Sequence, residues 1–267
     1  MKTKTNRVAI VTGASSGIGL ATARLLTARG YTVYGVSRHG CKGEKFRSLR
    51  CDVTQSHDVT ACVARVIAEA GRIDLLVNSA GMGISGSAEN TPSDHMEAIF
   101  RVNVYGTVAM CRAVLPTMRA QGGGRILNVG SVAGELPIPF QAFYSATKSA
   151  VASYSRALAM EVRPFGILVS CILPGDTRTG FTAARVKNPD DDACYGKRIT
   201  RSVEKMEHDE THGMRAEAVA KKIVRTASRK HPAPTVAVGI SYRFLLALAK
   251  FLPRRLVDRI LYHMYAK

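Results

Sequence analysis

The chain has 267 residues, of which 46% are hydrophobic and 22% charged, and its formal net charge is +18. This composition is typical of a globular protein, and the length suits one well-buried domain. No run of eighteen uninterrupted apolar residues occurs, which argues against a membrane-spanning helix. The apolar stretch Val8–Val11 is too short for the core of a signal peptide, so we expect a cytoplasmic protein.

The basic excess is spread over residues 38–50, 185–205, 215–230 and 243–259. No helix-turn-helix, zinc-finger or RNA-binding pattern accompanies it, so we expect no nucleic-acid partner. A plain basic surface, or attraction to an anionic cofactor, an acidic substrate or an anionic membrane, stays open. The six cysteines lack CxxC and metal-ligand spacings, which predicts free thiols and no metal site.

Short apolar runs alternate with helical patterns along the chain. Helices are expected near 17–29, 55–70, 92–119, 143–163 and 215–229. Continuous apolar runs are typical of strands buried on both faces, and they occur at Val8–Thr12, Thr32–Val36, Ser48–Cys51, Leu75–Asn78, Arg125–Gly130, Leu168–Leu173 and Thr235–Val238. The pattern predicts a single α/β domain over 1–267, doubly wound and Rossmann-type, with helices on both faces of a seven-stranded, mostly parallel sheet.

Two stretches are expected to contain little regular structure. The connection at 38–47 is short and rich in glycine and lysine, and we expect little or no helix there. Residues 175–214 are polar and weakly patterned, which is typical of a functional lid or a mobile loop.

A glycine-rich turn, TGASSGIG at 12–19, follows the first expected strand and opens a helix. Glycines let a pyrophosphate approach the backbone, and a helix N-terminus offers free N–H groups to phosphate. The spacing is GxxxGxG rather than GxGxxG, so a plain strand–helix turn is the alternative. The candidate cofactor-binding residues of this turn are Gly13, Ser15, Ser16, Gly17, Ile18 and Gly19.

Arg38 ends the second expected strand, where an acidic residue would bind the ribose 2′-hydroxyl of NAD. An arginine can instead pair with the 2′-phosphate of NADP, with Ser37 as a second donor. This position favours NADP(H) as the cofactor; a surface arginine is the alternative.

Tyr144 and Lys148 are four residues apart on an expected helix, and therefore on one face. A nearby ammonium lowers the pKa of a phenol, which brings it closer to the range useful for acid–base catalysis. Ser131 follows the fifth strand and could hold a substrate oxygen, while Asn103 is a polar residue in an apolar helical stretch. Taken singly, each residue also has an ordinary structural interpretation.

Together these residues resemble the short-chain dehydrogenase/reductase family. The resemblance runs from about Arg7 to Gly180 and includes the 12–19 turn, CDVT at 51–54, NSAG at 78–81 in place of the family's NNAG, and PGDTRT at 174–179. Asn103, Ser131, Tyr144 and Lys148 match the family's catalytic tetrad.

The resemblance implies a role for each matched residue. Tyr144 would exchange a proton with the substrate oxygen, and Ser131 would polarise the same oxygen. Lys148 would lower the pKa of the Tyr144 phenol and bind the nicotinamide ribose. Asn103 would hold a water in the proton relay. The remaining implied cofactor contacts are Asp52 and Val53 at the adenine, Asn78, Ala80 and Gly81 along the cofactor, and Pro174, Gly175, Thr177 and Thr179 at the nicotinamide.

Residues 234–267 form a last strand and an amphipathic helical extension that resembles the hydroxysteroid and retinoid dehydrogenase subgroup. One helix face carries Leu256, Val257, Ile260, Leu261 and Met264. Three interpretations stay open: packing on the core or a partner subunit, an apolar cover over a lipophilic pocket, and a basic segment on a membrane surface.

We therefore expect an NADP(H)-dependent enzyme that interconverts a carbonyl and an alcohol on a small lipophilic, steroid-like or retinoid-like substrate. A general or acyl-chain carbonyl reductase is the alternative within the family, and a non-catalytic NADP-binding or membrane-surface protein is the alternative outside enzymes. The resemblance also implies a homodimer or homotetramer.

Overall fold

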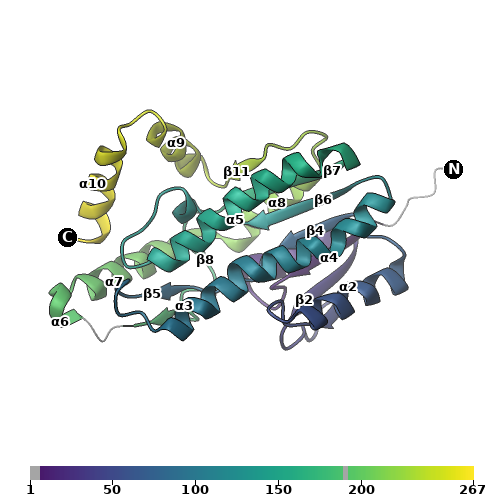
Figure 1. The fold of residues 1–267 in the computed structure, drawn as a ribbon, viewed down its shortest axis with the longest axis horizontal. Helices are drawn as coiled ribbons and strands as arrows, with labels where there is room; N and C mark the ends of the chain where they lie inside the picture. Colours follow the sequence, from purple (N-terminus) through teal and green to yellow (C-terminus); the bar gives the residue numbers. More distant parts are fainter. Residues whose placement is uncertain (1–6, 189–191) are drawn as a thin grey trace.

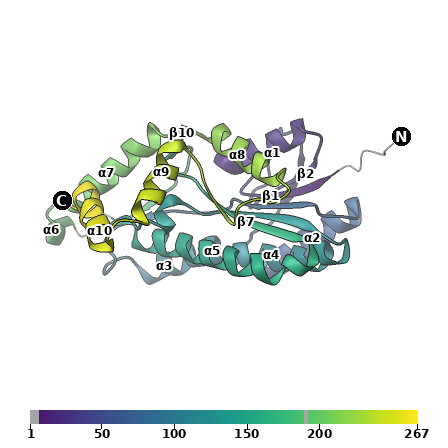
Figure 2. The same ribbon diagram turned by 90° about the horizontal axis from the view of Figure 1, so that it is seen from above.

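A seven-stranded parallel sheet forms the middle layer between two layers of helices (Figures 1 and 2). The computed structural model describes residues 7–188 and 192–267; residues 1–6 and 189–191 of the predicted domain lie outside this part. The strands, in their order across the sheet, are β11 (Thr235–Ala237), β7 (Ile167–Leu173), β6 (Gly124–Val129), β4 (Leu75–Asn78), β1 (Val8–Thr12), β2 (Thr32–Ser37) and β3 (Arg47–Arg50). Each begins and ends within one residue of its predicted position, and the predicted fold class is confirmed.

The strand order reverses between β1 and β4, which are paired at the centre of the sheet. The chain leaves the carboxyl ends of these two strands toward opposite edges of the sheet, and this divergence opens a crevice at the carboxyl edge. The predicted glycine-rich turn follows β1 and therefore lies in that crevice.

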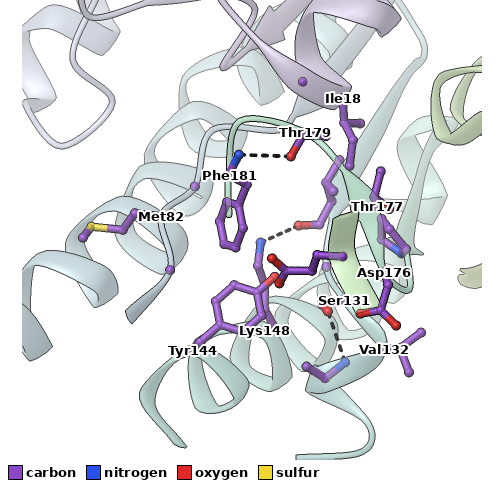
Figure 3. Close-up of a pocket in the computed structure, with 18 of the residues that line it drawn as sticks. Ile18, Met82, Ser131, Val132, Tyr144, Lys148, Asp176, Thr177, Thr179 and Phe181 are labelled. Carbon is purple, nitrogen blue, oxygen red and sulfur yellow. Dashed lines mark hydrogen bonds between the residues drawn. The ribbon is translucent and has the colours of Figure 1, made fainter. Parts of the chain in front are cut away.

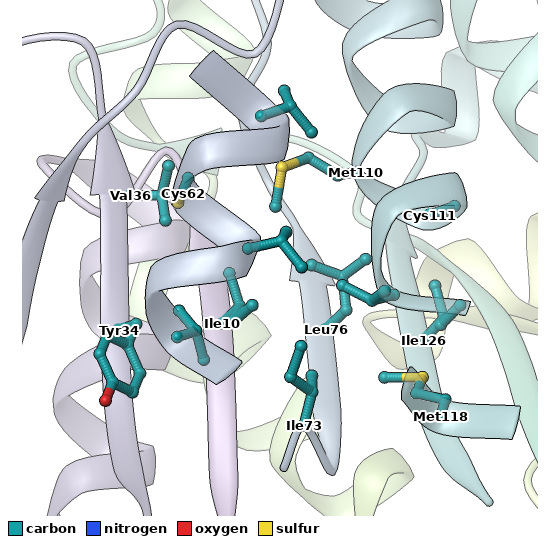
Figure 4. Close-up of a cluster of buried hydrophobic side chains, with 14 of the residues drawn as sticks. Ile10, Tyr34, Val36, Cys62, Ile73, Leu76, Met110, Cys111, Met118 and Ile126 are labelled. Carbon is teal, nitrogen blue, oxygen red and sulfur yellow. The ribbon is translucent and has the colours of Figure 1, made fainter. Parts of the chain in front are cut away.

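The helices cover both faces of the sheet. On one face lie α1 (Gly17–Ala28) and α8 (Ala216–Ala227), and on the other α2 (Ser56–Ala70), α4 (Gly106–Ala120) and α5 (Ala142–Glu161). Figure 4 shows the core on the second face, where Ile10, Leu76 and Ile126 of the sheet lie under α2 and α4. These three side chains are fully buried, and so are Val11 and Val77 on the other face, which explains why the apolar runs in the strands are unbroken.

The predicted helix at 92–119 is a continuous helical stretch with an irregular centre. It consists of α3 (Ser93–Phe100), a π-helical turn η1 (Arg101–Tyr105) and α4. By length and composition alone this stretch could span a membrane. Met110 and Met118 are fully buried against the sheet, however, so it is a core helix of the fold.

The structure corrects the prediction for residues 175–214 and confirms that 38–47 lacks a helix. The segment 175–214 contains β8 (Thr177–Arg178), which pairs with β10 (Met214–Arg215). It also contains β9 (Val186–Lys187), which pairs with β5 (Ile84–Ser85). It also contains the short helix α6 (Asp192–Tyr195) and the longer helix α7 (Arg198–Thr211). Only Ile199, Ser202 and Met206 of α7 are buried, so one narrow stripe carries the packing and the rest of the helix is polar.

The extension after β11 folds into α9 (Ile240–Ala249) and α10 (Arg254–Tyr265), at one end of the molecule in Figure 1. Leu246, Val257 and Leu261 pack against a buried cluster that includes Leu136 and Leu173. The remaining short helices are the 3₁₀ turns η2 (Val132–Gly134) and η3 (Arg163–Phe165).

Candidate active site

A cavity of about 760 Å³ lies along the carboxyl edge of the sheet and reaches α9 and α10. The residues that follow β1, β2, β3, β4, β6 and β7 line it, together with apolar residues of the two C-terminal helices. Figure 3 shows the part of this cavity around Tyr144 and Lys148. All predicted site residues line it except Asn78 and Asn103.

The glycine-rich turn has a backbone that side chains would obstruct. Gly13 has a φ of +66°, and a Cβ built on it would lie 2.9 Å from the backbone of Ala80. A Cβ on Gly19 would lie 2.2 Å from the Gly13 carbonyl oxygen. Thr12 Oγ1 accepts hydrogen bonds from the N–H groups of Ser79 (3.0 Å) and Ala80 (3.1 Å), which joins the ends of β1 and β4. The N-terminus of α1 is thereby held at the cavity, as an anion-binding turn requires.

Ser37, Arg38, Asp52 and Val53 line the cavity beyond this turn. Arg38 is exposed, and the Asp52 carboxylate accepts hydrogen bonds from the N–H and hydroxyl of Thr54, at 2.9 and 2.8 Å. This end of the cavity therefore combines a free guanidinium with an oriented carboxylate, which suits a ribose and its phosphate.

Asn78 does not line the cavity, contrary to what the family resemblance implies. Its amide nitrogen donates to Asn128 Oδ1 at 2.9 Å in a buried network beneath α4. Strand alternation explains the difference, because Ser79 is the next residue and lines the cavity. The structure thus assigns Asn78 to the sheet–helix interface.

Asn103 lies in the π-helical turn η1 and is almost fully buried. Its side chain accepts a hydrogen bond from the Met82 N–H (2.9 Å) and donates to the Met82 carbonyl and Thr147 Oγ1, each at 3.0 Å. These contacts connect the segment after β4 to α5. Asn103 therefore fixes the segment after β4 against α5, and its side-chain amide is occupied by hydrogen bonds to Met82 and Thr147.

Ser131, Tyr144 and Lys148 lie together on the cavity wall (Figure 3). Ser131 Oγ accepts a hydrogen bond from the Ala133 N–H at 3.1 Å, which fixes its side chain at the start of η2. Lys148 Nζ lies 5.7 Å from the centroid of the Tyr144 ring and donates to the Val129 carbonyl at 2.9 Å. One helix and one strand end thus bring a hydroxyl, a phenol and an ammonium to one place.

Burial shifts the pKa values of the two titratable groups in opposite directions. It raises the pKa of Tyr144 to about 12, although hydrogen bonding to Ser131 lowers it in part. It lowers the pKa of Lys148 to about 8, because the charged ammonium is poorly solvated. In the protein alone the pKa of the phenol is therefore raised and not lowered as expected, because desolvation outweighs the lowering effects of the Ser131 hydrogen bond and the Arg185 charge.

The loop after β7 closes the cavity from the other side. Pro174, Gly175, Thr177 and Thr179 line it, and the Val132 N–H donates to the Pro174 carbonyl at 2.9 Å. Tyr242 of α9 packs directly on Gly175, where a Cβ would lie 2.2 Å from its ring. The C-terminal extension is therefore built onto this loop.

A buried ion pair lies next to the aromatic side chains Phe181 and Tyr144. Arg185 has no exposed side-chain surface and pairs with Glu210 of α7, whose second oxygen accepts a hydrogen bond from Thr182 at 2.6 Å. Glu210 lines the cavity, as does Phe181, whose ring centroid lies 5.6 Å from that of Tyr144. Sequence reasoning missed these residues because they belong to the segment predicted to be irregular.

The far end of the cavity is apolar, and four of the five residues on the predicted apolar face of the C-terminal helix line it. Residues of three segments converge there: Leu136 and Ile138 after β6, Leu245, Leu248, Ala249 and Leu252 of α9 and the following turn, and Val257, Ile260, Leu261 and Met264 of α10. The polar end and the apolar end belong to the same cavity.

Comparison with known proteins agrees with this geometry. A family model described as short chain dehydrogenase matches residues 7–190. The chain is 40% identical over 266 residues to a 3-ketodihydrosphingosine reductase of Bacteroides thetaiotaomicron, covering 97% of this chain and 98% of the relative.

Solved structures show the same fold. A short-chain dehydrogenase from Streptomyces avermitilis superposes with a TM-score of 0.85 at 29% identity, covering 97% of both chains. A 3-ketoacyl-(acyl-carrier-protein) reductase from Brucella melitensis, complexed with NADH, superposes with a TM-score of 0.73 at 26% identity, covering 89% of this chain and 98% of that chain.

Proposed function

Because the chain belongs to the short-chain dehydrogenase family, we propose that it is an NADP(H)-dependent reductase of a lipophilic ketone. The chain is an oxidoreductase that acts on a carbonyl or alcohol group, and the proposal adds the cofactor, the direction and the substrate class. The observation that carries it is the single cavity that joins Ser131, Tyr144 and Lys148 to an apolar end under α9 and α10.

The site residues fit a dinucleotide. Gly13 and Gly19 leave no room for a Cβ, which keeps the backbone open to a pyrophosphate at the start of α1. Arg38 and Ser37 at the end of β2 would bind the 2′-phosphate, Asp52 and Val53 the adenine end, and Pro174 to Thr179 the nicotinamide end. When bound, the reduced cofactor supplies the hydride.

The protonated state of Tyr144 suits the proton-donor role that reduction requires. With a pKa of about 12, the phenol keeps its proton at neutral pH and can donate it to the substrate oxygen. Ser131 Oγ accepts from a backbone N–H and keeps its own proton to donate to the same oxygen. The Lys148 ammonium, 5.7 Å from the ring, stabilises the phenolate that proton transfer leaves behind.

A long alkyl chain suits the apolar end better than a small polar substrate. The Bacteroides relative at 40% identity is a 3-ketodihydrosphingosine reductase, and we take that long-chain ketone as the first candidate substrate. Steroid-like, retinoid-like and acyl-chain carbonyls stay in the test panel.

We also propose that the extension contacts a membrane surface. Large side chains on α9, the following turn and α10 are exposed, among them Phe244 (70%) and Phe251 (87%). Residues 240–267 carry six lysines and arginines against a single aspartate. Leu245, Leu248, Ile260 and Met264 are exposed and also line the cavity, so this apolar surface borders the cavity itself. A basic apolar rim of this kind suits an anionic bilayer that holds the substrate.

The cytoplasmic location, the single domain over 1–267 and the homodimer or homotetramer stay predictions. Light scattering of the purified full chain, with and without NADPH, measures the oligomeric state.

A substrate panel tests the proposed reaction. The wild-type chain and Tyr144→Phe are assayed for NADPH oxidation with a 3-keto sphingoid base, a steroid ketone, retinal and a short acyl ketone, and NADH is tested in parallel. We expect reduction of the long-chain ketone with NADPH, and loss of turnover in Tyr144→Phe while cofactor still binds. Equal activity of Tyr144→Phe, or no turnover of any carbonyl by the wild-type chain, contradicts the proposal.

A further inference from the structure

Asp176 places a carboxylate on the cavity wall beside the proposed catalytic residues. It follows Gly175 in the loop after β7 and lines the cavity with Ser131 and Tyr144. The Val132 N–H donates to the Pro174 carbonyl at 2.9 Å, which places the loop that carries Asp176 beside the Ser131–Val132 segment (Figure 3). Burial is the largest cause of the raised Tyr144 pKa, and the charges of Glu210 and Asp176 add to it. Both carboxylates are therefore within electrostatic reach of the phenol.

The negative charge of Asp176 is only partly compensated. Its Oδ2 accepts a hydrogen bond of 2.5 Å from the Tyr242 hydroxyl. Within residues 7–188 and 192–267, no lysine, arginine or histidine forms a salt bridge with it. Glu210, in contrast, is neutralised by Arg185. Asp176 is thus the carboxylate on this wall that can accept a cation from a ligand.

We propose that Asp176 determines substrate specificity by binding a protonated amine on the carbon next to the carbonyl that Tyr144 and Ser131 hold. This inference rests on the proposed function and deepens it, because it names the polar group that accompanies the long chain. A 3-keto sphingoid base has an amine on the carbon adjacent to its ketone. A carboxylate that lines the same wall as the proton donor is placed to receive that amine.

The arrangement around Asp176 supports the assignment. The Tyr242 hydroxyl fixes one carboxylate oxygen, and the Tyr242 ring rests on Gly175, so the position of a carboxylate that lines the cavity is held from two sides. The apolar residues Leu245 and Leu248 line the cavity in the next two turns of α9 after Tyr242. A ligand with a cation at its reacting end and a long alkyl tail therefore matches both parts of the cavity.

The same geometry predicts selection against neutral ketones. A steroid or fatty-acyl ketone has no cation to pair with Asp176. When such a ketone binds, the Asp176 carboxylate loses water and gains no hydrogen-bond partner in its place. Leaving a charged group desolvated and unpaired is costly, and discrimination of this kind is stronger than discrimination by apolar fit alone.

A matched pair of substrates isolates this interaction. Steady-state kinetics with NADPH compare 2-amino-1-hydroxyoctadecan-3-one with 1-hydroxyoctadecan-3-one, both in nonionic detergent micelles. The variants are Asp176→Asn, which keeps the shape and removes the charge, and Asp176→Glu, which keeps the charge. Glu207→Gln removes a carboxylate that pairs with Lys187 and lies outside the cavity lining, and it serves as the control.

We expect Asp176→Asn to lower kcat/KM for the amino ketone by roughly 10- to 100-fold, mainly through KM, because a charge-assisted hydrogen bond is lost. Its kcat/KM for the deaminated ketone should rise, because the neutral amide costs less to desolvate than the carboxylate. Asp176→Glu recovers part of the loss on the amino ketone, and Glu207→Gln resembles the wild type.

Equal losses on both ketones, or no loss on either, overturn the role of Asp176. A wild-type chain that prefers the deaminated ketone also overturns it, while the proposed reductase function stands. If the wild-type chain reduces neither ketone, both proposals fail.

Discussion

Burial sets the protonation of Tyr144 and Lys148, and it destabilises the positive charge of Lys148. Tyr144 is kept neutral, while the Lys148 ammonium is retained at a cost to the folded state. Such a charge is expected where a site is organised for catalysis instead of stability.

Replacing Lys148 should stabilise the protein at neutral pH. Its pKa falls from 10.5 to about 8 on folding, which corresponds to a cost of about 3 kcal/mol below pH 8. The unfolded chain binds the extra proton between pH 8 and 10.5, so wild-type stability rises with pH in this window. Lys148→Met removes the cost and the hydrogen bond to the Val129 carbonyl, so we expect a net gain of about 1–2 kcal/mol at pH 7 and loss of turnover.

Urea unfolding at pH 7 and pH 9.5 measures this effect. The stability difference between Lys148→Met and wild type should shrink at the higher pH, and Lys230→Met, at an exposed lysine, should show no such change. A variant less stable than wild type at pH 7, or a difference independent of pH, contradicts the expectation.

Arg38 carries the proposed preference for NADP(H). Arg38→Asp replaces an exposed guanidinium at the cavity with a carboxylate that repels the 2′-phosphate and accepts a ribose hydroxyl. We expect the ratio of kcat/KM for NADPH to that for NADH to fall by about 100-fold, since a charge-assisted pair is lost and a repulsion is gained. Arg29→Asp, at the opposite edge of the sheet, is the matched control. An unchanged ratio in Arg38→Asp would remove this residue as the phosphate-binding group.

The residues and the family resemblance predicted side chains that line the cavity, with Asn78 and Asn103 as the exceptions. Asn78 and Asn103 were both expected at the cofactor or the reacting group, and the structure places their side chains in buried hydrogen-bond networks. Spacing cannot show on which side of a strand end a side chain lies. Nor can it show the balance of desolvation against charge that sets the Tyr144 pKa.

At the scale of elements, each strand of the seven-stranded sheet and the helices that cover it followed from apolar periodicity, because burial on both faces leaves a clear pattern. The two-residue strands β5, β8, β9 and β10 were not predicted. α7 was missed because its stability depends on a narrow buried stripe and on pairs such as Lys205–Asp209, four residues apart. The cavity wall built from α7, α9 and the loop after β7 depends on contacts between segments distant in sequence, which no local pattern records.

The contact between α9 and the loop after β7 can be tested through Gly175. A Cβ at this position would overlap the Tyr242 ring, whereas a Cβ at Gly180 has no atom within 4 Å. We expect Gly175→Ala to lower the free energy of unfolding by about 1–3 kcal/mol through overpacking, and Gly180→Ala to have little effect. Thermal unfolding measures the stability of both variants, and limited proteolysis measures how far α9 is loosened in each.

A double-mutant cycle assigns the cause of the Gly175→Ala effect. If the clash with Tyr242 is responsible, adding Tyr242→Ala should give a combined loss smaller than the sum of the two single losses. Additive losses would show that α9 is not built onto this loop through that contact.

At the scale of the whole molecule, the active-site cavity and the basic, apolar extension lie at the same end. The carboxyl edge of the sheet holds the polar half of the cavity, and α9 and α10 complete it with residues that are partly exposed. A protein that docked on an anionic bilayer through these helices would present the mouth of its cavity to the lipid.

This orientation predicts salt-sensitive binding to anionic vesicles through α10. Arg255 and Arg259 are exposed on that helix, and each basic residue near an anionic surface contributes about 1 kcal/mol. We expect Arg255→Glu/Arg259→Glu to weaken binding to vesicles of phosphatidylcholine and phosphatidylserine by about tenfold or more in flotation assays. Arg29→Glu/Arg163→Glu makes the same charge change at the amino edge of the sheet, away from the extension, and should bind like the wild type. Reduction of a water-soluble ketone should be equal in all three proteins, whereas reduction of a vesicle-embedded ketone should fall only in the α10 variant. Equal vesicle binding by the two double variants would show that the attraction comes from net charge and not from this end of the molecule.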